Sequence, residues 1–203
     1  MSDKNIKRIS LAITGASGVQ YGLRLLELLL KADCHVDVMI SKAAQLVIAT
    51  ETDLALPGRS SAQQDFLRQH FNADERLRVF GKEDWMAPVA SGSGKYQAMV
   101  ICPCSTGTLS AVATGASNNL IERAADVALK ERRQLIMLLR EMPLSEIHLN
   151  NMLTLTRMGA VIMPASPGFY HKPQSVQDMV DFVVARILDQ LGIDQQLVSR
   201  WGE

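Results

Sequence analysis

The residues of this chain that could do chemistry gather first in a glycine- and serine-rich stretch near its start. The stretch Thr14–Gly18 follows the short, mostly apolar run Ile9–Ile13 and precedes a leucine-rich segment that begins at Val19. Glycines let a backbone come close to a ligand, and the first turn of a helix presents free N–H groups to an anion. The order of strand, glycine-rich loop and helix is therefore typical of a turn that binds phosphate.

The spacing of the glycines narrows the choice of ligand. Gly15, Gly18 and Gly22 do not fit the G-x-G-x-x-G fingerprint of dinucleotide sites, and no lysine follows the loop as a P-loop requires. A mononucleotide is therefore the better prediction. From this stretch alone an ordinary strand-to-helix turn, in which Ser17 only caps the helix, stays open.

Three further polar clusters follow apolar runs in the same way. They are Ser41 after His35–Ile40, the segment 104–108 after Ala98–Pro103, and Arg140-Glu141 after Gln134–Leu139. If these runs are parallel strands, the clusters face one crevice at the carboxyl edge of the sheet, where doubly wound folds bind ligands. An arginine that is always charged, placed among hydroxyl groups, suits the phosphate of a flavin or a nucleotide.

Metal and serine-hydrolase chemistry are not expected. The 4 histidines are scattered without ligand spacing, so no metal ligand is predicted. Cys102 and Cys104 have no partner pair and are expected to be buried structural residues at a strand end. The sequence around Ser17 lacks the G-x-S-x-G elbow of the serine hydrolases.

The bulk composition indicates a globular protein without a nucleic-acid or membrane partner. Lys and Arg number 21 and Asp and Glu 21, which gives a net charge of zero. The basic residues before Ile9–Ile13 imitate a signal peptide, but that apolar run is too short and ends in a turn. The 3 cysteines fit a reducing compartment, and we expect a cytoplasmic protein.

Apolar periodicity predicts an α/β fold with five strands, formed by the four runs above and Ala160–Met163. Helices are expected from Val19, over 43–50, 60–71, 118–133 and 145–159, and from Ser175, and the segment 72–96 is predicted to be a long loop. Strands alternating with helices form a doubly wound parallel sheet, here one domain over residues 1–203. The order of the strands stays open.

Together these motifs resemble those of the flavin prenyltransferases, which belong to the flavodoxin-like family of FMN-binding proteins that also includes the cysteine decarboxylases. The motifs are Thr14-Gly-Ala-Ser-Gly18, Ser41-Lys-Ala-Ala44, Glu51-Thr-Asp53, Pro103-Cys-Ser105, the segment 123–132, Arg140-Glu141, Gly168-Phe-Tyr-His171 and Pro173-Gln-Ser175. The resemblance implies a Rossmann-like, flavodoxin-like domain that transfers a dimethylallyl group from dimethylallyl phosphate to reduced FMN. It further implies a homo-oligomer, a dodecamer, that supplies prenylated FMN to a partner decarboxylase in ubiquinone biosynthesis or aromatic acid decarboxylation.

The resemblance also assigns roles to single residues. The FMN contacts it implies are Gly15, Ala16, Ser17, Ser41, Ser105, Thr106, Gly107, Thr108 and Arg140. The catalytic residues it implies are Ser17, Glu51, Lys130 and Glu141. Dimethylallyl phosphate would be held by Tyr170 and Arg186, with Arg123 and Lys130 entering from a neighbouring subunit. Trp85 and Trp201 are expected either to line the pocket or to lie in a core or interface.

Two other functions remain open, namely an FMN-dependent decarboxylase of the cysteine type and a non-catalytic FMN carrier. Neither needs the set Lys130, Arg140, Glu141 and Tyr170, which suits a phosphorylated substrate. Similar enzymes usually have Pro before the Arg-Glu pair and Thr or Ala after it, where this chain has Leu139 and Met142. The difference concerns substrate preference or local packing rather than the reaction class.

Overall fold

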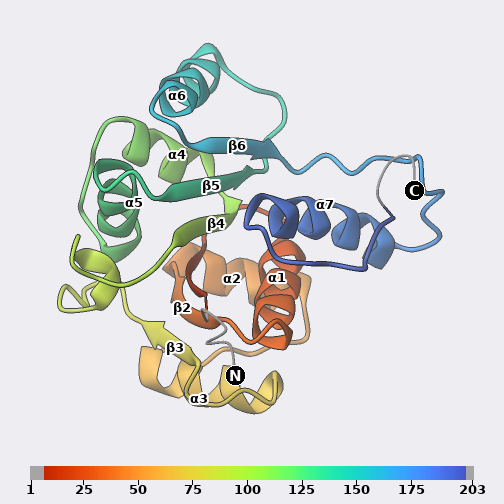
Figure 1. The fold of residues 1–203 in the computed structure, drawn as a ribbon, viewed down its shortest axis with the longest axis horizontal. Coiled ribbons are helices and arrows are strands. Elements are labelled where there is room, and N and C mark those ends of the chain that lie inside the picture. The colour runs from red at the N-terminus through yellow and green to blue at the C-terminus, as the bar shows by residue number, and fades with distance from the viewer. Residues whose placement is uncertain (1–6, 200–203) are drawn as a thin grey trace, which may run out of the picture.

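A computed structural model describes residues 7–199 of the protein. Its core is a six-stranded sheet in the order β3-β2-β1-β4-β5-β6, in which every neighbouring pair is parallel (Figure 1). The strands are β1 (Arg8–Ile13), β2 (His35–Ile40), β3 (Leu77–Phe80), β4 (Ala98–Cys104), β5 (Gln134–Leu139) and β6 (Val161–Pro164). The order reverses between β1 and β4, as in the Rossmann arrangement, so the doubly wound fold expected from the sequence is confirmed.

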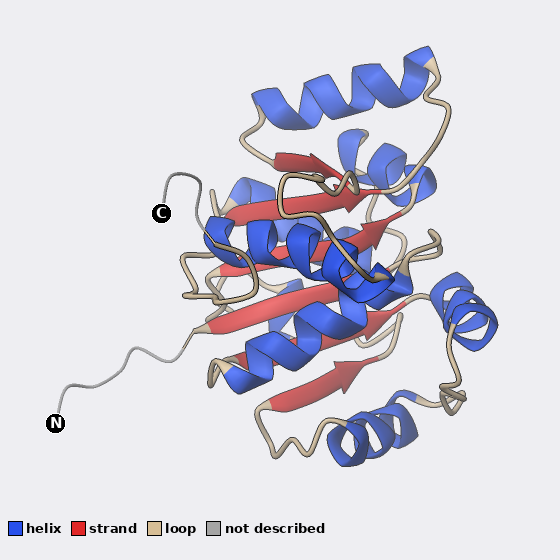
Figure 2. Ribbon diagram, turned by 90° about the vertical axis from the view of Figure 1, so that its right-hand side faces the viewer, coloured by secondary structure: helices blue, strands red, loops and turns tan. Residues whose placement is uncertain are grey.

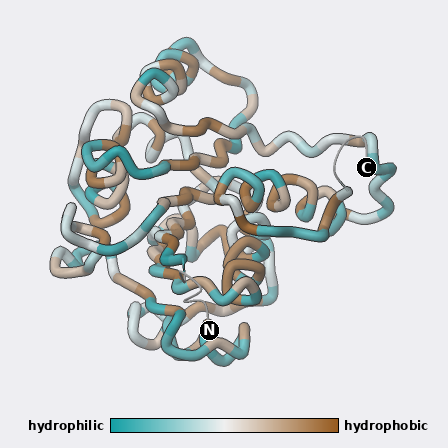
Figure 3. Tube along the Cα trace, in the orientation of Figure 1, coloured by the Kyte–Doolittle hydropathy of each residue, from teal (hydrophilic) through white to brown (hydrophobic). Residues whose placement is uncertain are grey.

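Helices cover both faces of this sheet (Figure 2). They are α1 (Val19–Lys31), α2 (Lys42–Glu51), α3 (Ser60–His70), α4 (Thr106–Ala113), α5 (Leu120–Lys130), α6 (Glu146–Arg157) and α7 (Val176–Gln190), with a 3-10 turn η1 (Pro88–Ala90). Side chains of β4 alternate between two cores, Val100 facing the core of α1 and α7 and Met99 facing that of α4 and α5. Figure 3 shows hydrophobic residues concentrated in the strands and in α1.

The segment 72–96 corrects one expectation, because it is not a long loop. It contains the edge strand β3 and the turn η1. In β3 the side chains of Leu77 and Val79 are buried and those of Arg78 and Phe80 are half-buried. Arg78 also forms a bidentate pair with the buried Asp37 of β2, its Nε and Nη2 each lying 2.9 Å from a carboxylate oxygen. A four-residue strand with a charged residue at its centre leaves little apolar pattern to detect.

The helix α1 packs very closely on the centre of the sheet. A Cβ atom on Gly22 would lie 2.3 Å from the carbonyl oxygen of Cys102 in β4, so only glycine allows this approach. Cys102 and Cys104 are buried free thiols, as expected, and burial raises the pKa of both. None of the helices described is both long and apolar enough to cross a lipid bilayer.

Candidate active site

The four polar clusters meet at the carboxyl edge of the sheet, because β2, β1, β4 and β5 are consecutive neighbours. Backbone hydrogen bonds join them in that order: the N–H of Ser41 donates to the carbonyl of Ile13 at 3.0 Å, and the N–H of Arg140 donates to that of Cys104 at 3.3 Å. Between them lies the loop of Gly15, Ala16 and Ser17. The mixed origin of these residues explains why no single segment of the sequence reveals the site.

Two helices begin at this crevice and keep backbone donors available. Ser41 caps α2, its Oγ accepting from the N–H of Ala44 at 3.0 Å, and Ser105 caps α4, its Oγ accepting from Thr108 at 3.3 Å. Within the described chain no acceptor is found for the N–H groups in the first turns of α2 and α4, those of Lys42, Ala43, Thr106 and Gly107. Such groups, at the positive end of two helix dipoles, form a site for phosphate.

A third helix, α1, also begins at the crevice, but the carboxylate of Glu51 accepts hydrogen bonds from N–H groups at its start. Oε2 of Glu51 accepts from the N–H of Gly18 at 2.9 Å and of Val19 at 3.2 Å. Burial acts to raise the pKa of Glu51, but hydrogen bonds from Ser17, Gly18 and Val19 and the charge of Arg140 bring it below the ordinary value. The carboxylate is therefore ionised at neutral pH, and a bound phosphate is directed to α2 and α4 rather than to α1.

Arg140 contacts the loop that follows β1, and Glu141 contacts the start of α4, which follows β4. The Nε of Arg140 donates to the carbonyl oxygen of Ser17 at 3.2 Å. Glu141 accepts from the hydroxyl of Thr106 at 3.3 Å through Oε2 and from the N–H of Met142 at 3.1 Å through Oε1. A cation, two carboxylates and several hydroxyls thus face one crevice, which suits binding a phosphorylated ligand and moving a proton.

A small cavity of about 170 Å³ lies beside the first turns of α2 and α4. Its lining includes Ser41 and Thr108, two of the predicted FMN contacts, together with Lys42, Lys82 and Asn119, to which the sequence analysis gave no role. Lys42 directly follows Ser41, so its position was a usable signal. Lys82 lies in the segment expected to be a loop, and nothing in its neighbourhood distinguished it.

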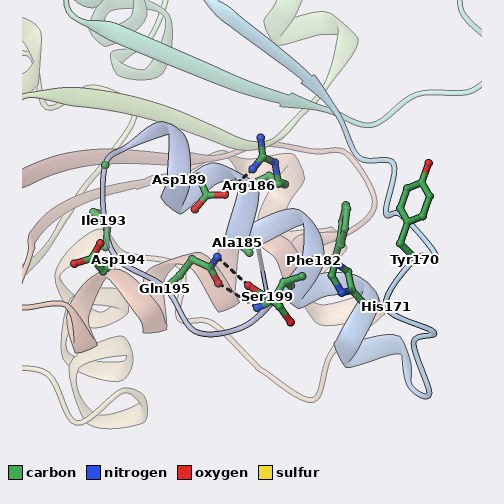
Figure 4. Close-up of a pocket in the computed structure, with 12 residues that line it drawn as sticks. Tyr170, His171, Phe182, Ala185, Arg186, Asp189, Ile193, Asp194, Gln195 and Ser199 are labelled. Carbon is green, nitrogen blue, oxygen red and sulfur yellow. Dashed lines mark hydrogen bonds and ion pairs between the residues drawn. The ribbon is translucent and has the colours of Figure 1, made fainter. Parts of the chain in front are cut away.

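Tyr170 and Arg186 both line a different cavity, of about 690 Å³, in which the two side chains stand apart from each other (Figure 4). Tyr170 comes from the loop after β6 and Arg186 from α7, and the ring of Phe182 also lines the cavity. Nη1 of Arg186 contacts the carboxylate of Asp189 at 2.7 Å. This cavity shares no lining residue with the four clusters, and the role of Tyr170 and Arg186 stays a prediction.

Arg123 and Lys130 do not reach the crevice of their own chain. Arg123 donates from Nε to the carbonyl of Ala90 at 3.0 Å, and Lys130 pairs with its neighbour Glu131. Since α5 ends at Lys130, just before β5 begins, Lys130 lies near the amino edge of the sheet, opposite the crevice.

Trp85 lies away from the crevice, and the two changed neighbours of the Arg-Glu pair differ in exposure. Trp85 is 47% exposed and lines a pocket with Arg8 and Lys95. Arg8 begins β1 and Lys95 precedes β4, so this pocket lies at the amino edge of the sheet. Trp201 lies outside the described residues. Leu139 is buried and Met142 is 86% exposed. Within residues 7–199 no group of three His, Cys, Asp or Glu side chains could hold a metal ion.

Comparison with known proteins gives close relatives by sequence. The Flavoprotein family matches residues 1–188. Flavin prenyltransferase UbiX of Pseudomonas aeruginosa is 67% identical over 198 residues, which cover 97% of this chain and 95% of the relative.

Two crystal structures combine sequence and structural similarity with this chain. AnUbiX (PadA1) in complex with FMN and dimethylallyl pyrophosphate is 41% identical, with a TM-score of 0.87 and coverage of 98% of this chain and 99% of that one. A dodecameric FMN-dependent UbiX-like decarboxylase from Escherichia coli O157:H7 is 38% identical, with a TM-score of 0.84 and coverage of 97% and 100%. Both extend over nearly the whole fold described above.

Proposed function

The chain belongs to the flavin prenyltransferases of the Flavoprotein family, and from this premise we propose that it transfers a dimethylallyl group from dimethylallyl phosphate to reduced FMN. The observation in this chain that carries the proposal is the pair of open helix N-termini beside Arg140 and Glu141. Reduced FMN supplies the electron-rich ring to which the prenyl group is joined. AnUbiX, solved with FMN and a prenyl donor, supports these two ligand classes.

The donors in the crevice would hold FMN with its phosphate at the free N–H groups of α2 and α4. At that place a Cβ on Gly107 would find open space, and Ser41 and Ser105 add hydroxyls. The first loop approaches α2 so closely that a Cβ on Gly15 would lie 2.5 Å from that of Ala43. Ser17 and Arg140 then serve the ring end of the ligand.

The remaining site residues act on charge and protons. In the assembled protein Tyr170 and Arg186, which line a separate cavity within one chain, would hold the donor phosphate beside Arg140, and the two arginines would stabilise the negative charge that develops as it departs. Glu141 handles the proton of phosphate departure or ring closure. Ser17, whose hydroxyl helps to lower the pKa of Glu51, would relay a proton in the same crevice.

A homododecamer would complete the site, with Arg123 and Lys130 entering from a neighbouring subunit. The outer helix α6 supports assembly, because Leu155 is its only fully buried residue while Ile147, Leu149 and Leu153 are 68%, 52% and 48% exposed. Figure 3 shows hydrophobic residues on this peripheral helix. Exposed apolar faces of this kind mark contacts between subunits, and the Escherichia coli neighbour is dodecameric.

Mixed oligomers test the shared site. Lys130→Met and Glu141→Gln are each expected to be nearly inactive alone, but random co-assembly should restore about a quarter of the sites, since a symmetric interface pairs Lys130 of one subunit with Glu141 of the next. The measurement is prenylated flavin formed by the co-expressed variants, with each variant co-expressed with itself as control. No recovery in a verified mixed oligomer, or an active monomer by light scattering, would contradict the arrangement.

The product would pass to a partner decarboxylase, in ubiquinone biosynthesis or the decarboxylation of aromatic acids. We place the protein in the cytoplasm, because its 3 cysteines are unpaired thiols and a reducing compartment keeps them so.

Mass spectrometry of the released flavin tests the function directly. After anaerobic incubation of the protein with reduced FMN and dimethylallyl phosphate, we expect an FMN adduct that carries one dimethylallyl unit, with release of inorganic phosphate. A parallel incubation with dimethylallyl pyrophosphate shows which donor is used. The Escherichia coli neighbour is called a decarboxylase, so loss of carbon dioxide from an aromatic acid without any flavin adduct would favour that second function instead.

A further inference from the structure

The hydroxyl of Thr14 joins the loop that follows β1 to the segment at the end of β4. Thr14 is only 1% exposed, and its Oγ1 donates to the carbonyl oxygen of Pro103 at 2.8 Å while accepting from the N–H of Ser105 at 2.8 Å. We propose that Thr14 is a positioning residue that sets the phosphate-binding start of α4 relative to the ring-binding loop of Ser17. The inference rests on the function proposed above.

The need for such a link follows from the strands. The ladder between β1 and β4 ends at the pair Ala12 and Ile101, and the pairing of β4 with β5 is irregular between Ile101 and Cys104. The ends of β1 and β4 would therefore separate just before the loops that follow them enter the crevice. Besides the N–H of Thr14, which donates to Pro103 at 3.2 Å, its hydroxyl bridges this gap.

The bridge extends directly to both ends of the proposed ligand site. On one side Ser105, held by Thr14, caps α4 and so fixes the free N–H groups of Thr106 and Gly107. On the other side Ser17 follows Thr14 after only two residues and is tied to Arg140. A change in this one hydroxyl thus alters the distance between phosphate donors and ring contacts.

The test compares three variants, each assayed as the assembled protein for its affinity for FMN by flavin fluorescence. Thr14→Val keeps the shape but loses the hydroxyl, and we expect FMN to bind about 10-fold more weakly or worse, the scale of one or more misplaced hydrogen bonds. Thr14→Ser restores the hydroxyl and should bind within about 3-fold of the original. Ser10→Ala is the matched control, since Ser10 is fully buried on β1, the strand that leads to Thr14, and its hydroxyl has no partner within the described chain.

A second readout separates positioning from general stability. At saturating FMN and donor, the kcat of Thr14→Val should still fall by roughly 10-fold, because a small misplacement of reacting groups costs rate even when binding is complete. If Thr14→Val does not fold, Thr14→Cys replaces it. Its FMN affinity and kcat should fall less than those expected for Thr14→Val, because a thiol still donates and accepts weak hydrogen bonds.

The outcomes distinguish this inference from the function on which it rests. An original protein that binds FMN and prenylates it, together with a folded Thr14→Val that matches it in affinity and kcat, overturns the positioning role alone. Equal losses in Thr14→Val and Thr14→Ser also overturn it, because the hydroxyl is then not the cause. An original protein that binds no FMN overturns both.

Discussion

Replacing Glu141 by glutamine is expected to reduce the formation of prenylated FMN by about 10²-fold or more, the usual scale for losing a general acid or base. FMN should still bind within a few-fold of the original affinity. The oxygen of glutamine can accept from the N–H of Met142, and its NH2 group can donate to the hydroxyl oxygen of Thr106, so both contacts of the carboxylate have a replacement. Only the charge and the basicity are lost, so the loss of rate reports proton transfer.

The matched control for Glu141 is Glu75→Gln, at an exposed position outside the helix α6 that is proposed to support assembly. It removes the same charge and should leave both FMN affinity and rate unchanged. Single-turnover assays with each variant provide the measurement. If Glu141→Gln turns over at the original rate, the carboxylate is only a partner of Arg140 in the crevice, and the proton goes to phosphate itself.

Most of the sheet could be predicted from the sequence because its strands are buried on both faces. Gln134–Leu139 and Ala98–Cys104 read as continuous apolar runs, which is typical of parallel strands under two helix layers. The strand β3 and the helix α4 were missed for opposite reasons. The first has a charged residue at its centre, and the second, Thr106–Ala113, begins with the hydroxyls and glycine that suggest a loop.

The clusters of the candidate site followed from the same reasoning, because strand ends in a parallel sheet must share an edge. What the sequence alone could not give were contacts between distant segments. Glu51 closes the start of α1 from 32 residues away along the chain, and Thr14 reaches Ser105 across 91 residues. The placement of Lys130 at the opposite edge of the sheet depends on the direction of α5, which a list of motifs does not contain.

Removing the charge of Arg140 is expected to lower the rate of prenylation more than removing the charge of Glu141. Arg140→Met removes the guanidinium that contacts the loop of Ser17, and with it a fixed positive charge at the proposed phosphate. We expect FMN affinity to fall about 10-fold or more and the rate of prenylation by roughly 10³-fold, near the upper range for removal of one preorganised donor to a developing anion. Arg140→Lys should recover only part of this, because lysine keeps the charge but not the planar fork of donors.

The charge of Arg140 also acts on Glu51, which gives the Arg140→Met variant a second signature. In the original protein burial acts to raise the pKa of Glu51, while hydrogen bonds and then Arg140 lower it, so the carboxylate stays ionised below its ordinary pKa. Without Arg140 the pKa of Glu51 rises, and the acid side of the pH–rate profile moves to higher pH. The shift should be small, because the bonds from Ser17, Gly18 and Val19 remain. Arg59→Met, directly before α3, removes a charge from an exposed position and should change neither the rate nor the profile. If Arg140→Met retains the original rate, the departing phosphate is stabilised by other cations and Arg140 only ties the first loop in place.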